Sequence, residues 1–273
     1  MRASLQLLAS CLAFLTCALA AQADERTNQL LDRLGMSEMV EIMRQEGVSY
    51  AEQLAEDMLP GGSTATWRTN VNRIYDREAM KLLVQGGFAK ALSGTDISAA
   101  EDFFDADLGA RIVELEVSAR RAMLDEDIEE AAKERAGQLE TSAAKTFAQV
   151  EQLIEQGDML EANVVSALNS NILFYRGLVD GGAYELSDAE IVSDVWSQEE
   201  EMRKETRDWL FGFFLMAYDP LAGEDLERFI AFSATEAGQT LTRAIFAAYD
   251  GMYTDISYAL GLAVAQEMRA EDI

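Results

Sequence analysis

The sequence contains no histidine, only two cysteines and only two prolines. Both cysteines, Cys11 and Cys17, lie within the first 23 residues, which have the features of a removable leader. Without imidazole and thiol groups, the rest of the chain cannot form a disulfide, a Cys/His zinc site, a histidine-ligated haem or a histidine-dependent catalytic triad. The sequence therefore indicates no catalytic residue, no metal ligand set and no cofactor.

Residues 1–23 resemble a secretory signal peptide. Arg2 precedes an apolar run from Leu5 to Ala20, and two sites of the small-x-small type end at Ala20 and Ala23. The run is shorter than the ~20 residues of a membrane span. We expect cleavage near Ala20 or Ala23 and a periplasmic or secreted mature chain. An alternative is a lipoprotein with its lipid on Cys11, although little apolar sequence precedes that residue.

Positive charge is scarce. The chain has 49 acidic and 22 basic residues, and removal of Arg2 with the leader takes the net charge from −27 to −28. Nucleic acid and anionic membrane surfaces are therefore excluded as expected partners. We interpret the acidity mainly as a solvated surface in a compartment where salt screens repulsion. The alternative is attraction of cations or of a basic partner.

Apolar residues recur at helical spacing throughout the chain, and no segment alternates as a strand would. This pattern predicts an all-α helical bundle of about eight to ten helices, with breaks at 59–64, 180–182 and 218–225. Residues 209–218 are apolar on every side, which indicates a central helix or the wall of an apolar pocket. Four pairs with the acid first are spaced as exposed i,i+4 ion pairs: Glu116 and Arg120, Glu129 and Lys133, Glu199 and Arg203, and Glu200 and Lys204.

Several features recur after 129 residues. Residues 92–97 (LSGTDI) match 221–226 (LAGEDL), and three pairs of single residues share the offset: Phe103 with Phe232, Gly109 with Gly238, and Trp67 with Trp196. A fixed offset of this kind indicates duplication of a multi-helix unit. We predict a signal peptide (1–23), a first helical unit (24–124), a charged connecting helix (125–160) and a second, related unit (161–273).

Residues 96–111 resemble the signature of the bacterial family called domain of unknown function 2059. Phe103, Phe104, Ala106, Gly109 and Arg111 occupy the aromatic pair, the small position, the glycine and the basic position of that pattern. Phe232, Thr235, Gly238 and Gln239 occupy the corresponding positions later in the chain, with Ser233 in place of the second aromatic. The departures are Ala106, where the family favours a hydroxyl residue, and Asp107 and Glu236, where it favours proline. The resemblance implies an exported all-helical protein but supplies no activity.

The two aromatic-glycine motifs predict helix corners. A glycine in the first turn of a helix costs about 1 kcal/mol relative to alanine, and close approach of the preceding helix is the simplest compensation. We expect Asp96 to cap the helix before Gly109, and Asp105 or Asp107 to cap the helix that contains it. Packing is therefore our main interpretation of both motifs. The candidate binding residues, should either motif contact a ligand, are Phe103, Phe104, Gly109, Arg111, Phe232, Gly238, Trp67 and Trp196. We expect each tryptophan to pack beneath the corner of its own unit.

Other chemistry has weaker support. Asp105, Asp107 and Glu116 span twelve residues like a calcium loop, but the glycine falls at the wrong position and a third loop carboxylate is missing. We therefore expect an exported binding or envelope-associated interaction module whose partner is a protein or a small apolar ligand. The alternatives are a carboxylate-dependent hydrolase, with or without a metal, and a structural or chaperone-like envelope protein.

Overall fold

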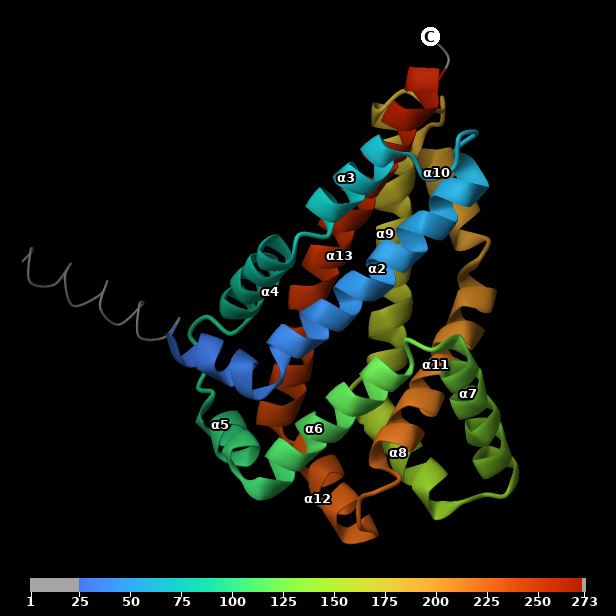
Figure 1. Ribbon diagram of the computed structural model, residues 1–273. Coiled ribbons are helices and arrows are strands. Elements are labelled where there is room, and N and C mark those ends of the chain that lie inside the picture. Colours follow the sequence, from blue (N-terminus) through green and yellow to red (C-terminus); the bar gives the residue numbers. More distant parts are fainter. Residues whose placement is uncertain (1–24, 272–273) are drawn as a thin grey trace, which may run out of the picture.

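The computed structural model describes residues 25–271, so the expected signal peptide lies outside the described residues. These residues form an all-α structure without strands, in which helical residues 25–33 precede twelve further helices (Figure 1). The helices are α2 (Met36–Met58), α3 (Ala65–Ile74), α4 (Arg77–Ala91), α5 (Ser98–Asp105), α6 (Asp107–Ala122), α7 (Glu126–Thr141), α8 (Lys145–Gln156), α9 (Met159–Asp180), α10 (Asp188–Trp196), α11 (Glu199–Tyr218), α12 (Gly223–Ser233) and α13 (Glu236–Glu271). The helices are more numerous than we expected, but all three predicted breaks are confirmed.

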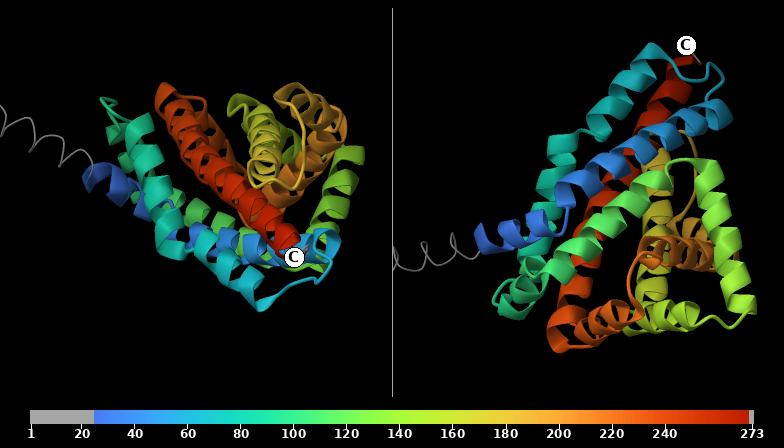
Figure 2. Two further views of the ribbon diagram at one scale, coloured as in Figure 1. Left: turned by 90° about the horizontal axis from the view of Figure 1, so that it is seen from above. Right: turned by 60° about the horizontal axis from the view of Figure 1, so that its bottom comes forward.

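The molecule is organised around α13, a helix of 36 residues that runs along its full length beside α9. The two backbones approach closely because glycines lie at the contact. A Cβ atom on Gly177 would lie 2.3 Å from the carbonyl oxygen of Tyr258, and one on Gly261 would lie 2.1 Å from that of Phe174. In Figure 1 and in the right view of Figure 2, α2 and α6 form a layer in front of α9 and α13.

The apolar segment predicted within 209–218 is the buried C-terminal half of α11. Seven of its side chains are almost inaccessible to solvent: Leu210, Phe211, Phe213, Phe214, Leu215, Ala217 and Tyr218. They contact α6, α7, α8 and α9. This segment is therefore a central helix of the fold. Within residues 25–271, none of the helices combines the length and the apolar composition needed to cross a bilayer.

Residues 125–160 do not form the single connecting helix that we predicted. The segment is divided between α7 and α8, because Ala143 adopts a left-handed backbone conformation with φ of 51°. Both helices pack on α11, and α8 also packs on α12. Their small inward residues, such as Ala132 and Ala136, are buried despite the many charges on the outer faces. The segment is therefore part of the packed structure as well as a connection.

Candidate functional site

Two helix corners hold the aromatic-glycine motifs, one between α5 and α6 and the other between α12 and α13. A Cβ atom on Gly109 would lie 2.2 Å from the carbonyl oxygen of Phe103 and 2.6 Å from the Cα of Phe104. At Gly238 the corresponding distances, to the carbonyl oxygen of Phe232 and the Cα of Ser233, are 2.3 and 2.7 Å. Each glycine therefore permits the backbone of the preceding helix to touch the next one. The geometry is that of a packing device.

The aromatic residues of the two corners meet. The rings of Phe103 and Phe232 are stacked with their centres 4.0 Å apart, and Phe104 meets Phe232 edge to face at 5.7 Å. Phe229 also stacks on Phe103, with 6.0 Å between ring centres. Phe104 is buried. These rings pack against one another, which leaves them little surface for a ligand. This arrangement agrees with our packing interpretation.

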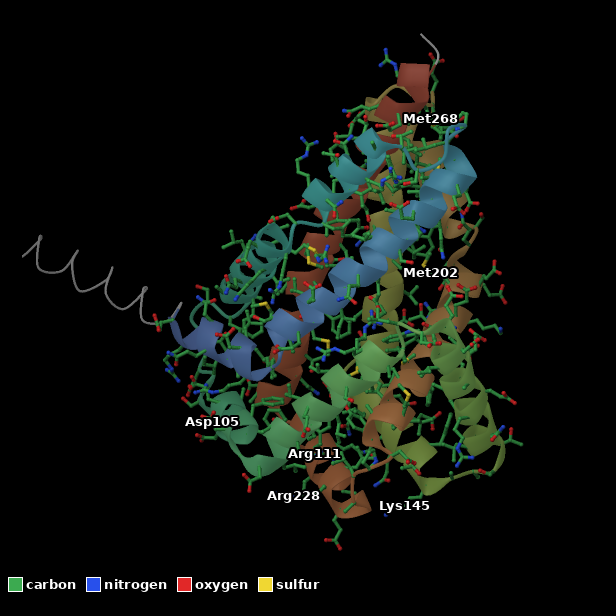
Figure 3. The ribbon with its side chains drawn as sticks, viewed as in Figure 1. Asp105, Arg111, Lys145, Met202, Arg228 and Met268 are labelled. Atoms are coloured by element: carbon green, nitrogen blue, oxygen red, sulfur yellow. The ribbon has the colours of Figure 1, made fainter. Side chains whose placement is uncertain are left out.

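The predicted basic residue of the motif, Arg111, lies outside this cluster. Its guanidinium group is exposed and pairs with Glu114 on the same helix, with 2.7 Å between Nη1 and Oε2. Figure 3 shows Arg111 and Asp105 at the lower end of the molecule, near the first corner. Neither residue joins a buried site.

Helix capping differs between the two corners. Asp96 accepts a hydrogen bond from the amide of Ser98, the first residue of α5. The N-cap position itself is occupied by Ile97, which provides no side-chain cap, so Asp96 is not the N-cap that we expected. Ala106 precedes α6, which has no side-chain cap, so the predicted capping by Asp105 or Asp107 is wrong. Asp105 instead pairs with Arg33. In the second corner, Thr235 Oγ1 accepts a hydrogen bond from the amide of Gly238 at 3.1 Å.

The first residues of the two helices explain this difference. Ala106 has no hydroxyl, whereas Thr235 provides one for the first turn of α13. Asp107 and Glu236 are the first residues of α6 and α13. An acid is favourable at that position through the helix dipole.

We expect Ala106→Ser to raise the free energy of unfolding by about 1 kcal/mol. Ala106 has extended backbone angles, φ −79° and ψ 155°, so a serine hydroxyl can accept a hydrogen bond from the first turn of α6. Thr235→Ala should lower stability by a similar amount. Urea denaturation of both variants measures the two changes. A neutral Ala106→Ser beside a destabilising Thr235→Ala would mean that the two corners do not present equivalent capping positions.

The tryptophans occupy different environments. Trp67 is completely buried, and its Nε1 donates a hydrogen bond to the carbonyl oxygen of Ala51 at 3.1 Å. Trp196 has 56% of its surface exposed, so the prediction that it packs beneath its own corner is wrong. Trp196 is the last residue of the short helix α10, whose buried face is already formed by Ile191 and Val195.

Glu116 and Arg120, which we expected on the surface, make polar contacts with neighbouring helices in the interior of the molecule. We refer to these two residues and their polar partners as the polar seam. Glu116 and Arg120 do not pair with each other as predicted; both face neighbouring helices from α6. Tyr218 on α11 donates a hydrogen bond to Glu116, with 2.5 Å between the hydroxyl and Oε1. Arg120 makes a bidentate ion pair with Glu46 on α2, at 2.5 and 2.7 Å. Helical spacing identified their shared face but not what covers it.

Aromatic groups surround the Arg120 guanidinium. Its Cζ lies 4.7 Å from the ring centre of Trp209, a cation-π contact. Burial raises the pKa of Glu46 against the opposing effect of Arg120. Burial also raises the pKa of Tyr253 to about 12, while the nearby Arg120 acts in the opposite direction. The seam therefore links α2, α6, α11 and α13 through one charged pair.

Glu116 is the most strongly perturbed carboxyl on this seam. The residue as a whole is half-buried, but its carboxyl group is enclosed, and this burial raises its pKa to about 7. The hydrogen bond from Tyr218 only partly offsets the cost of ionisation. The same burial and the neighbouring carboxylate raise the pKa of Tyr218 well above its usual value. Glu116 can therefore hold a proton near neutral pH, although it lines neither of the two surface cavities described below.

Of the other three predicted ion pairs, two form and one does not. Lys133 pairs with Glu129 at 2.6 Å and Arg203 pairs with Glu199 at 2.7 Å, which confirms two of the pairs. Lys204 approaches Asp208 instead of Glu200, so that pair is wrong. Two of the residues considered for calcium have other partners, because Asp105 pairs with Arg33 and Glu116 bonds to Tyr218. No cluster of acidic residues suited to a metal occurs within residues 25–271.

Neither of two surface cavities has the lining that a carboxylate enzyme needs. One, of about 320 Å³, lies between α3 and α13 and has no acidic residue in its lining. The other, of about 500 Å³, lies between α8 and α12. Its only carboxylate, Glu227, pairs with Lys145 at 2.8 Å. Neither cavity places two carboxylates together, as acid-base catalysis of glycoside hydrolysis requires.

The outer side of α10 carries an exposed apolar ridge. Val192 and Trp196 are one turn apart and have 37% and 56% of their surfaces exposed. The inner side of α10 packs through a small core formed by Val164, Leu168, Ile191 and Val195. Met202, labelled in Figure 3, packs at the edge of this core. Within the described structure, α10 packs mainly on α9 and leaves this ridge exposed to solvent.

The sequence around this ridge is strongly acidic. Residues 177–202 contain eight acidic residues and no lysine or arginine. Three of these side chains flank α10 in the chain, are exposed and make no ion pair within the described structure: Glu185, Glu200 and Glu201. Asp194 is exposed too, but it is two residues from both Val192 and Trp196 and therefore lies on the opposite side of the helix. We refer to Glu185, Glu200 and Glu201 together with Val192 and Trp196 as the α10 surface. Sequence reasoning missed it because Trp196 was assigned to the core.

Comparisons with family models, curated proteins and solved structures give no match to this chain.

Proposed function

We propose that this chain is an exported, two-unit helical interaction module that binds a partner through the α10 surface. The exposure of Trp196 beside Val192 is the observation that carries the proposal. A tryptophan that leaves half of its area in water forgoes burial worth more than 1 kcal/mol. Tryptophan is also enriched among the residues that dominate the energy of protein interfaces.

The order of the helices supports two related units. The offset of 129 residues aligns α2, α4, α5 and α6 with α9, α11, α12 and α13, with α7 and α8 between the two sets. Helix α3 has the same place in the order as α10, but the offset moves it to residues 194–203, across the end of α10 and the start of α11. In each set the first helix contacts the third and the fifth. The contacts between sets also correspond, because α4 packs on α13 and α6 packs on α11.

The stacked rings support a two-fold relationship between these units. Phe103 and Phe232 are equivalent under the offset, and they stack on each other. Equivalent residues meet in this way at the axis of a two-fold interface. The matching close contacts of Gly109 and Gly238 agree with that arrangement. The fold therefore resembles a fused dimer, with Trp67 buried in one unit and Trp196 exposed in the other.

Export remains part of the proposal because the apolar leader ends in small-residue cleavage sites. Within the described residues, a fold held by its apolar core needs neither a disulfide nor a metal, which suits an exported chain without cysteine. The resemblance to domain of unknown function 2059 stays a prediction.

A carboxylate-dependent hydrolase is the second candidate, and the raised pKa of Glu116 is the observation that favours it. Its support is weaker, because Glu116 bonds to Tyr218 inside the helix packing and lines neither of the two cavities described above. A structural or chaperone-like envelope protein would also be consistent with an exposed apolar ridge.

Native mass spectrometry of the protein isolated from its own envelope fraction tests the proposed function. We expect a complex with a protein partner that survives isolation from wild-type cells and is lost in Trp196→Ser. Leu82→Ser is the matched control, because Leu82 is 67% exposed on α4, away from the α10 surface. Wild-type protein that is always free of a protein partner would contradict the interaction module, whereas turnover of a substrate that depends on Glu116 would favour the hydrolase.

A further inference from the structure

The charge of the α10 surface restricts what can cover it. Of the acidic residues in 177–202, several are already occupied: Asp188 pairs with Arg176, Glu190 forms the capping box of α10, and Glu199 pairs with Arg203. Glu185, Glu200 and Glu201, which flank α10 in the chain, remain unneutralised within the described structure. Glu200 and Glu201 follow Trp196 by only four and five residues.

Resting on the proposed function, we infer that the α10 surface binds a cationic amphipathic helical segment of another protein. The occupant needs an apolar stripe for Val192 and Trp196 and lysine or arginine beside it for Glu185, Glu200 and Glu201. A helix provides both, because residues three and four apart share a face. The structure thus assigns to this surface a partner that is both apolar and basic.

Other occupants fit less well. A second copy of the chain would bring the same acidic surface against its own charge, which is unfavourable. Anionic lipid headgroups meet the same repulsion. A small apolar ligand would leave the carboxylates unpaired and would find an exposed ridge on α10 instead of an enclosed cavity.

The length of the ridge limits the expected affinity for the partner. The nine residues of α10 extend over about 14 Å, or two and a half helical turns. A contact of that length belongs to the small interfaces typical of transient complexes. We therefore expect a dissociation constant on the order of 10 μM, with a marked dependence on salt because several charges attract the partner.

Tryptophan fluorescence can report this binding directly. Trp67 is completely buried and Trp209 is partly buried, so Trp196 is the tryptophan most accessible to a quencher. The probe is a synthetic 18-residue helical peptide of leucine and lysine at amphipathic spacing. A peptide of the same length with glutamate in place of lysine is the negative control. We expect the lysine peptide to shift the emission to shorter wavelength and to protect Trp196 from acrylamide, and the glutamate peptide to do neither.

Variants distinguish a specific surface from general attraction to an acidic protein. Calorimetric titration with the lysine peptide should show binding weakened at least about tenfold by Trp196→Ser, as for a residue central to an interface. The triple variant Glu185→Gln, Glu200→Gln, Glu201→Gln should also weaken binding. The matched control neutralises three exposed acids elsewhere, Glu56→Gln, Asp57→Asn and Glu78→Gln, and should change the affinity less than twofold.

Five outcomes would overturn the inference. Equal weakening by both triple variants would mean non-specific attraction, and equal binding of the glutamate peptide would remove the charge requirement. Self-association in sedimentation experiments that is lost in Trp196→Ser would identify a second copy as the occupant. Binding of vesicles containing phosphatidylglycerol through Trp196 would identify a membrane. A protein partner found by native mass spectrometry that withstands Trp196→Ser would place the proposed function on another surface.

Discussion

Replacing Gly109 by alanine should lower the free energy of unfolding by about 2–4 kcal/mol. The added Cβ would lie 2.2 Å from the carbonyl oxygen of Phe103 and 2.6 Å from the Cα of Phe104. Both are backbone atoms of α5, so no side-chain rotation can relieve the clash. Separation of α5 from α6 would also disturb the stack between Phe103 and Phe232. Gly238→Ala should have an effect of similar size, because its contacts with α12 match.

The control for this experiment is Gly137→Ala. Gly137 lies within α7, and a Cβ built there meets no other atom within 4 Å. Alanine at such a position should stabilise the protein by up to about 1 kcal/mol. Urea denaturation should therefore show a lower free energy of unfolding for Gly109→Ala and Gly238→Ala and a higher one for Gly137→Ala. A neutral or stabilising Gly109→Ala would show that the first corner does not depend on close backbone contact.

Glu116→Gln should stabilise the protein at pH 8 by about 3 kcal/mol and have little effect at pH 4.5. Burial raises the pKa of Glu116 from 4.5 to about 7, so the folded state retains a proton that the unfolded chain releases. Stability is thus lost as the pH rises from the unfolded pKa toward the folded one, and the full cost is present above it. Glutamine is uncharged and can still accept the hydrogen bond of Tyr218.

Denaturation at both pH values measures this difference. The control is Glu114→Gln, because Glu114 lies two residues earlier on α6 and its side chain is 69% exposed. It should change stability by less than about 1 kcal/mol at either pH. A Glu116→Gln effect of the same size at pH 4.5 and pH 8 would show that the carboxyl group titrates in the folded protein much as it does in the unfolded chain.

The protonation of Glu116 also affects the contact between α6 and α11. Its bond to Tyr218 joins α6 to α11, one of the two corresponding contacts between the proposed units. Tyr218 in turn lies edge to face with Phe229, with 5.9 Å between ring centres, beside the stacked aromatic rings of the corners. Protonation of Glu116 therefore changes the energy of the contact between units without a ligand taking part.

The sequence by itself determined the local structure of this protein. Apolar residues at helical spacing specify a helix without reference to the rest of the chain, so the all-α class and the breaks at 59–64 and 180–182 are confirmed. The Phe–Gly corners are also local, because Gly109 contacts residues only five or six positions earlier. The pairs Glu129–Lys133 and Glu199–Arg203 formed for the same reason: one helix brings residues four apart together.

Only the tertiary structure decided which surfaces cover one another. Helical spacing shows that Glu116 and Arg120 share a face, but not that Tyr218, Glu46 and Trp209 lie against it, since those groups come from distant helices. The stack of Phe103 on Phe232 likewise depends on how α5 and α12 meet. Trp196 is exposed because Ile191 and Val195 already fill the inner face of α10 and no other described helix covers its outer face. An apolar side chain gains burial only where a second surface reaches it, and that depends on the path of the whole chain.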